Sequence, residues 1–249
     1  MTFMNFIKLA IALVISLGLF SCQDLSNTKQ NNYVSVVGQW HNQILQYQYA
    51  NSPKTQTTID GCLTYEAYQA TLESTRSFLV EGGFNAQEVD AAITNIDAFF
   101  EQNGLFNNYI EGTRCAVAYD SLFLNSMHDY AKNNVPQSAF EKSNLATIFA
   151  AYQNHASTEV IIDMIDAIPM ELYPTEQIIK LADYCSVFKA SSEYWQGDMQ
   201  IRDKDLFIDL WDAEGALVGG ATAGIPGAIT MGILFSKIAR EYCVAHNLQ

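Results

Sequence analysis

An aromatic ring, an imidazole and an amide occupy three consecutive positions at Trp40, His41 and Asn42. On one turn of a helix these groups could line a pocket, in which the imidazole could transfer protons near neutral pH. The competing interpretation is structural: Trp40 belongs to the core, while His41 and Asn42 hydrogen-bond a neighbouring helix end. We favour the structural interpretation and keep the three residues as a possible pocket.

The other residues that could serve catalysis are scattered along the chain. The histidines are His41, His128, His155 and His246. None has a second histidine three or four positions away, so helix-borne metal motifs are absent. Asp163 and Asp166 could share one helix face, although such carboxylate pairs usually face solvent. With no phosphate-binding loop, dinucleotide fingerprint or Gly-x-Ser-x-Gly motif, we expect no cofactor and no metal, and we favour a non-enzymatic role over an enzymatic one.

Cys22 has the sequence setting of a lipidation site. Lys8 is followed by an uncharged, apolar run over residues 9–20, which has the length of a signal-peptide core and is short for a bilayer-spanning helix. The run ends in Leu19-Phe20-Ser21-Cys22, which resembles a bacterial lipobox except at Phe20. We predict a lipoprotein signal peptide over residues 1–21 and a thioether between Cys22 and diacylglycerol. The alternative is an ordinary cysteine with conventional cleavage nearby.

The residues after the predicted cleavage point form a polar stretch. Residues 23–32 contain one leucine, no aromatic residue and several Asn, Gln, Ser and Thr. Such a segment cannot join a core and is typical of a flexible tether. Each buried acyl CH₂ contributes roughly 0.8 kcal/mol, so two or three chains would hold the protein on the membrane durably. We therefore assign residues 22–32 to the lipidated cysteine and its tether.

Four further cysteines could form disulfides after export. They are Cys62, Cys115, Cys185 and Cys243. An even number in an oxidising compartment allows up to two disulfides, with three possible pairings. Cys62 with Cys115 is our preferred pair, because both are expected near helix starts. The alternative is four buried thiols that pack as small hydrophobic groups.

A glycine-rich, uncharged segment runs from Gly215 to Ser236. Its glycines recur at a spacing that makes a small-residue stripe on a helix: Gly215, Gly219, Gly220, Gly224, Gly227 and Gly232. Such a stripe lets a partner helix approach closely, and Pro226 could begin a second helix. Internal packing of two short helices is the favoured interpretation. Entry into a bilayer and self-association are the alternatives, because about 20 apolar residues are enough to span a membrane.

Apolar residues recur at three- and four-residue spacing along most of the chain, which predicts helices. The expected helices cover 33–50, 63–81, 85–103, 113–132, 138–154, 158–168 and a segment from Pro174. Asn85 with Glu88 and Ser138 with Glu141 resemble capping boxes at two of the starts. No segment shows the sustained alternation of a half-buried strand. We predict an all-α fold, with residues 33–249 as one multi-helix domain that ends in a glycine-rich helical hairpin.

The chain is strongly acidic. Its formal net charge is −14, and removal of Lys8 with the signal peptide makes the mature protein more acidic still. Such a surface is repelled by nucleic acid and by anionic headgroups, so we expect no nucleic-acid partner.

Two segments carry a resemblance to known proteins. The run Gly38-Gln39-Trp40-His41-Asn42 and the Gly/Ala-rich segment from Asp212 to Gly232 resemble uncharacterised exported lipoproteins of Bacteroidetes-type bacteria. Those proteins often have a Gly-x-x-His-Asn helix near the start and a Gly/Ala-rich segment near the end. The resemblance implies an outer-membrane lipoprotein and leaves the membrane face open. The Gly/Ala pattern is also similar to hydrophobic hairpins of some bacteriocins.

These observations define three functional hypotheses. The favoured one is a lipid-anchored envelope protein with a non-enzymatic role, either structural or in binding a protein partner. The second is an envelope hydrolase or metal-dependent enzyme that uses His41 and nearby carboxylates. The third is a membrane-active or antagonism-related protein that uses the segment Gly215–Ser236.

Overall fold

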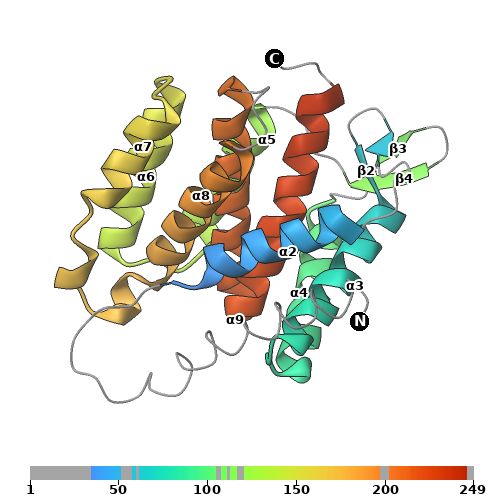
Figure 1. Cartoon of the computed structure of the whole chain (residues 1–249). Coiled ribbons are helices and arrows are strands. Elements are labelled where there is room, and N and C mark those ends of the chain that lie inside the picture. The colour runs from blue at the N-terminus through green and yellow to red at the C-terminus, as the bar shows by residue number, and fades with distance from the viewer. Residues whose placement is uncertain are drawn as a thin grey trace, which may run out of the picture. The chain divides into compact units, whose positions relative to one another are not determined.

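Helices make up most of the computed structural model, which describes residues 35–51, 58–59, 62–104, 108–110, 113–116, 121–196 and 202–245. The all-α prediction is confirmed (Figure 1). The predicted signal peptide, Cys22 and the tether lie outside the described residues, as does His246. The range Tyr33–Gln249 forms one compact unit.

The first three described helices are α2 (Val37–Asn51), α3 (Tyr65–Glu81) and α4 (Ala86–Gln102). The predicted capping of α4 by Asn85 is confirmed, because its side-chain oxygen accepts hydrogen bonds from two backbone amides in the first turn. The apolar faces of α3 and α4 are buried, and the two helices pack against each other.

A small antiparallel sheet, which the sequence pattern does not predict, accompanies the helices. Its strands are β1 (Thr58–Ile59), β2 (Cys62–Thr64), β3 (Asn108–Ile110) and β4 (Thr113–Ala116), in the order β1-β2-β4-β3. Strands of two to four residues are too short to show an alternating pattern, and the pairing of β2 with β4, which joins the two local strand pairs, links residues distant in sequence.

The sheet corrects two predicted helix starts. The helix expected over 113–132 begins only at Ser121, as α5 (Ser121–Asn134), because β4 occupies its first residues. The helix expected from Leu63 begins at Tyr65, because Thr64 ends β2 and caps α3. The Thr64 hydroxyl accepts a hydrogen bond from the backbone amide of Ala67 at 3.2 Å, so one residue closes the strand and opens the helix.

The next helices are α6 (Ala139–Gln153), α7 (Thr158–Asp166) and α8 (Ile179–Gln196). The capping box predicted at Ser138 and Glu141 is confirmed. Two short 3-10 turns, η2 (Met170–Leu172) and η3 (Thr175–Gln177), separate α7 from α8, so α8 starts later than the sequence predicts. The second oxygen of Glu141 accepts a hydrogen bond from the Lys180 backbone amide, which fixes the start of α8 beside α6.

The last element, α9 (Arg202–Ala245), is the predicted glycine-rich helical hairpin. The backbone leaves the helical conformation at Ala223 and Gly224, and Pro226 follows in the first turn of the second helix. We call residues 202–222 the first arm and residues 225–245 the second arm; they run side by side in Figure 1. The helices α8, α4, α2 and α5 pack against α9, which makes the hairpin the centre of the core.

Candidate functional site

Gly38 allows α2 to cross α8 at close range. A side chain at this position would collide with the backbone carbonyl of Ser186 on α8. The Gly38 amide instead donates a hydrogen bond to the Ser186 hydroxyl at 3.1 Å. The glycine of the Gly-x-x-His-Asn run therefore places α2, and with it His41 and Asn42, directly against α8.

Four glycines of the predicted stripe pack the two arms of α9 together. A Cβ at Gly219 would meet the carbonyl of Gly227, and a Cβ at Gly227 would meet that of Gly219. A Cβ at Gly215 would lie 2.6 Å from Cδ2 of Phe235. A Cβ at Gly232 would lie 3.3 Å from the backbone oxygen of Asp212 on the first arm and 3.2 Å from Cδ2 of His41 on α2. These distances are shorter than ordinary packing contacts, so the glycines let the arms, and α2 beside them, approach closely. The two arms of the glycine-rich segment therefore pack against each other inside the domain, as the favoured interpretation of the sequence predicts.

Gly220 and Gly224 do not belong to this packed stripe. A Cβ at Gly220 would make an ordinary contact with Ala228 at 3.4 Å. Gly224 has nothing within 4 Å of such an atom, and its φ of +63° is the left-handed conformation that turns the chain between the arms. The glycines of the predicted stripe therefore serve different purposes: some allow close packing of helices, and Gly224 turns the chain.

The chain reversal also bears on the membrane hypothesis. The range Leu206–Cys243 is long and apolar enough to cross a membrane by length and composition, and 67% of its most apolar window is buried inside the protein. The reversal at Ala223 and Gly224 divides the uncharged segment into residues 215–222 and 225–236. Each part is well short of the about 20 residues that a spanning helix needs. The hairpin conformation therefore lacks the continuous span that membrane crossing requires.

His41 faces a carboxylate deep inside this core. Its side chain is completely buried, and Nε2 lies 3.4 Å from Oδ2 of Asp212 on the first arm of α9. The same Asp212 oxygen accepts a hydrogen bond from the hydroxyl of Ser191 on α8 at 2.6 Å. Three helices, α2, α8 and α9, thus contribute polar groups to a single buried cluster.

The hydrogen bonds around Asn42 determine the tautomer of His41. The Asn42 amide nitrogen donates to the carbonyl of Ala190 at 2.6 Å, so the Asn42 oxygen faces Nδ1 of His41 at 3.1 Å. Because that oxygen only accepts, Nδ1 must carry a proton. A neutral His41 then presents the bare lone pair of Nε2 to Asp212. Two lone pairs repel, so the arrangement requires one proton between Nε2 and the carboxylate.

Burial indicates which of the two residues holds this proton. Desolvation lowers the pKa of His41 to about 4, partly opposed by its hydrogen bonds to Asn42 and the backbone of Gly232. Desolvation also raises the pKa of Asp212 well above its usual range. Both shifts favour uncharged groups, as expected for an apolar interior. We therefore describe the pair as a neutral imidazole and a protonated Asp212.

A second histidine–carboxylate pair lies on the same arm. Nδ1 of His128 on α5 lies 2.8 Å from Oε1 of Glu214, and the imidazole stacks on Phe149 with ring centroids 3.7 Å apart. Glu214 is buried, and desolvation raises its pKa while the hydrogen bond to His128 acts in the opposite direction. Asp212 and Glu214 are not among the site residues that the sequence patterns predict. Two acids immediately before an uncharged glycine-rich segment are the signal that could have indicated them.

The three residues of the predicted pocket separate in the structure. Trp40 packs edge-on against Phe78 and Phe84, and its indole covers Gly82. His41 is sealed in the core with 0% exposure. Of the three, only Asn42 lines an open cavity. His41 does converge with a carboxylate, as an enzyme would require, but no substrate can reach it without unfolding of its surroundings.

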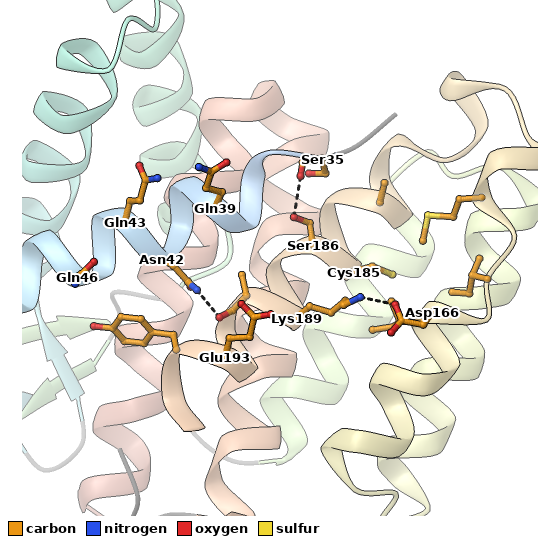
Figure 2. A pocket seen from close by; sticks show the side chains of 16 residues that line it. Ser35, Gln39, Asn42, Gln43, Gln46, Asp166, Cys185, Ser186, Lys189 and Glu193 are labelled. Carbon is orange, nitrogen blue, oxygen red and sulfur yellow. Dashed lines mark hydrogen bonds and ion pairs between the residues drawn. The ribbon is translucent and has the colours of Figure 1, made fainter. Parts of the chain in front are cut away.

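The open cavity is a groove of about 920 Å³ between α2, α7 and α8. Figure 2 shows Gln39, Gln43 and Gln46 along α2 and Lys189 and Glu193 along α8. Apolar side chains form the end near α7 and η2: Ile165, Ile168, Met170 and Ala182. Tyr194 lines the groove as well. The groove therefore combines uncharged amides, a few charges and apolar patches.

The predicted carboxylate pair on α7 also separates. Asp166 lines the groove and forms an ion pair with Lys189 of α8, as Figure 2 shows. Asp163 is exposed and does not line the groove. Within the described ranges, no group of three or more His, Cys, Asp or Glu side chains is arranged to hold a metal ion.

The cysteines fall into two classes. Cys185 and Cys243, two of the possible disulfide cysteines, are buried and form no disulfide in the described part of the structure. They pack as small hydrophobic groups, and burial raises the pKa of the Cys185 thiol. Cys62 and Cys115 lie on the adjacent strands β2 and β4, where the register pairs Cys115 with Thr64, two positions after Cys62. The Cys62–Cys115 disulfide stays a prediction.

Comparison with protein-family models, with curated proteins and with solved structures finds no match to this chain.

Proposed function

We propose that this chain is a lipid-anchored protein of the bacterial envelope whose helical domain binds a partner through the groove between α2, α7 and α8, without catalysing a reaction. The observation that carries the proposal is the set of three groove glutamines, Gln39, Gln43 and Gln46. None of their amides hydrogen-bonds another residue in the described part of the chain, and two of them are exposed.

The glutamines form one row because they are four and three positions apart on α2, which places them on the same helix face. The opposite face of α2 is buried through Val37, Ile44 and Leu45. Each amide offers two donors and one acceptor. A row of such groups beside a groove can replace its bonds to water with bonds to a ligand, which favours a binding role.

The nucleophiles that line the groove are not activated. The Ser186 hydroxyl accepts from Gly38 and donates to the backbone carbonyl of Ser35 at 3.3 Å. Burial raises the pKa of the Cys185 thiol, which suppresses the reactive thiolate. Lys189 is paired with Asp166. No histidine is among the groove residues, and the Ser186 hydroxyl donates to a backbone carbonyl rather than to a side chain that could act as its general base.

The proposed anchor explains how the domain would meet its partner. The lipobox-like run ending at Cys22 supports anchoring, and the polar residues 23–32 would let the domain move near the membrane surface. Outer-membrane location is what the resemblance to Bacteroidetes-type lipoproteins implies. A Cys22→Ala variant should lose incorporation of a clickable fatty acid and leave the membrane fraction. Retention of the variant in washed membranes would contradict anchoring through Cys22.

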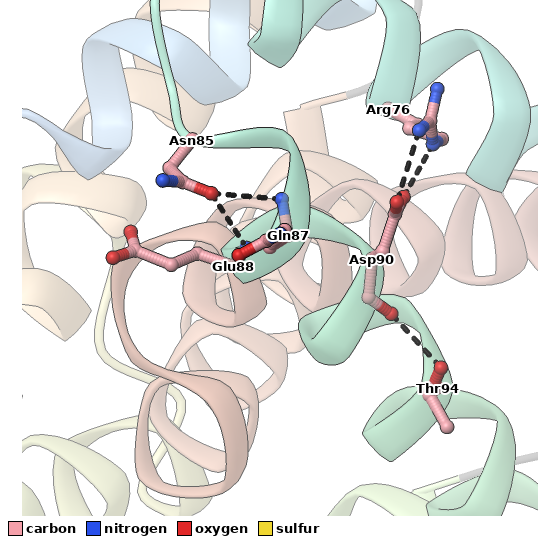
Figure 3. Close-up of polar contacts among 6 residues, drawn as sticks. All are labelled: Arg76, Asn85, Gln87, Glu88, Asp90 and Thr94. Atoms are coloured by element: carbon pink, nitrogen blue, oxygen red, sulfur yellow. Dashed lines mark hydrogen bonds and ion pairs between the residues drawn. The ribbon is translucent and has the colours of Figure 1, made fainter.

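The binding role is tested by site-specific photocrosslinking in living cells. A photoreactive residue replaces Gln43 in the groove, and the matched control replaces Gln87, an exposed glutamine on α4 shown in Figure 3. We expect discrete crosslinked species from position 43 that position 87 does not give. If the two positions give the same species, or neither gives any, the groove is not the binding site.

A further inference from the structure

We propose that the ligand of the groove is a neutral glycan chain, a proposal that rests on the binding role of the same groove. Sugar hydroxyls both donate and accept hydrogen bonds, as the side-chain amides of Gln39, Gln43 and Gln46 do. Repeating hydroxyl groups along a sugar chain match a repeating row of amides along α2.

The charges of the groove disfavour anionic ligands. Lys189 is neutralised by Asp166, and Glu193 adds a second carboxylate, so the lining carries a net negative charge. The whole chain is acidic as well, with a formal charge of −14. Phosphorylated or uronic-acid polymers would be repelled from such a surface. An uncharged polar polymer meets no such barrier.

The construction of the groove also disfavours peptide ligands. Its walls are the helices α2, α7 and α8 and the turn η2, so an extended peptide finds no strand edge to extend. An amphipathic helix needs a continuous apolar groove, whereas seven of the sixteen residues that line this one carry an amide or a charge. A proline-rich segment needs several aromatic rings, and among the groove residues only Tyr194 is aromatic. No arginine cluster is present there for a phosphopeptide.

The apolar residues of the lining favour a ligand that has apolar surfaces as well as hydroxyl groups, and a sugar chain has both. Ile165, Ile168 and Met170 at one end, and Tyr194 elsewhere in the groove, can cover the C–H faces of sugar rings while the amides bond the hydroxyls. Burial of both kinds of surface would give affinity without any charged contact.

The test is a binding titration of the mature protein in a detergent that contains no sugar. The probes are short chains of N-acetylglucosamine, glucose and mannose, with an acidic uronate chain and a random peptide library as comparison ligands. The variant is the triple substitution Gln39→Ala, Gln43→Ala and Gln46→Ala. The matched control replaces two exposed glutamines of α4, Gln87→Ala and Gln102→Ala.

We expect at least one neutral chain to bind, the triple variant to lose affinity by at least about tenfold, and the control to bind as the parent does. Absence of binding by all neutral chains, equal binding by the triple variant, or preference for the uronate chain would overturn the glycan assignment. Binding of peptides that depends on the three glutamines would also overturn it, while the proposed binding role of the groove would stand. Circular dichroism of the variants confirms that any loss of affinity occurs in folded protein.

Discussion

Asp212 and Glu214 lie two positions apart on the first arm of α9, and each faces a histidine from a different helix. Residues two apart on a helix point to nearly opposite sides. Asp212 therefore meets His41 of α2, while Glu214 meets His128 of α5. The central hairpin is thus connected to two neighbours by polar pairs within an apolar core, and these pairs can specify which helices lie beside it.

Replacement of Asp212 tests the hydrogen-bond arrangement at His41. Asp212→Ala leaves Nε2 of His41 and the Ser191 hydroxyl without their polar neighbour, so we expect a loss of about 2–5 kcal/mol in the free energy of unfolding. Asp212→Asn should cost about 1 kcal/mol or less, because the new amide nitrogen, in the place of Oδ2, can donate both to Nε2 and to the Ser191 hydroxyl. Urea unfolding followed by circular dichroism measures both. Equal losses would show that no proton between the two side chains is needed.

The pH dependence of stability follows from the single proton of this pair. In the unfolded chain His41 titrates near 6.5 and Asp212 near 3.8. Between these values the folded and the unfolded chain each hold one proton on the pair, so the pair does not make the free energy of unfolding depend on pH. Above pH 6.5 the folded state holds one proton more than the unfolded state, so stability falls as pH rises, until Asp212 ionises. Below about pH 4 the unfolded state holds more protons, so stability falls as pH falls.

The Asp212→Asn variant should introduce a pH dependence between pH 6.5 and 4, where the parent pair has none. His41 then remains neutral in the folded state, because burial lowers its pKa to about 4, while the unfolded chain takes up a proton below pH 6.5. The variant should lose stability relative to the parent by up to about 1.4 kcal/mol per pH unit between pH 6.5 and 4. If the free energies of unfolding of parent and variant change with pH in parallel over this range, the pair is not a neutral His41 and a protonated Asp212.

The two adjacent glycines of the first arm provide a matched comparison. Gly219→Ala should separate the arms, because its Cβ would collide with the carbonyl of Gly227, and we expect a loss of about 2–4 kcal/mol. Gly220→Ala should be neutral or slightly stabilising, because its Cβ would make an ordinary contact and alanine favours helix. Thermal unfolding distinguishes them. Similar melting temperatures for the two variants would argue against close packing of the hairpin.

The predicted disulfide can be tested by peptide mapping. We expect a Cys62–Cys115 cross-linked peptide in the exported protein under non-reducing conditions, and a stability loss of about 2–4 kcal/mol on its reduction. Cys185 and Cys243 should react with an alkylating reagent only after unfolding, because both are buried. Alkylation of Cys62 and Cys115 without prior reduction would refute the disulfide.

The sequence predicted the parts of the fold that depend on local patterns. Helix starts at Asn85 and Ser138 follow from side chains that cap nearby amides, and the hairpin follows from an uncharged run interrupted at Gly224 and Pro226. The sheet was missed because the pairing of β2 with β4 joins residues far apart in the chain, and such short strands show no pattern of their own.

The candidate site was only partly predictable for the same reason. Of the run at Trp40, His41 and Asn42, only Asn42 lines the groove, and the partner of His41 lies on α9, which can be known only from the packing. The row of Gln39, Gln43 and Gln46 is visible in the sequence as a polar helix face. That this face borders a groove depends on α7 and α8, which the spacing of residues on α2 does not reveal.

The side-chain amide signals of the groove glutamines test the central claim most directly. Nitrogen-15 labelled protein is titrated with a detergent-cleared envelope fraction of the source cells, and the amide resonances of Gln39, Gln43 and Gln46 are compared with those of Gln87 and Gln102 on α4. The proposed binding role predicts saturable shifts of the three groove amides and none at the two α4 positions. Unchanged groove signals, or equal shifts at all five glutamines, would contradict it.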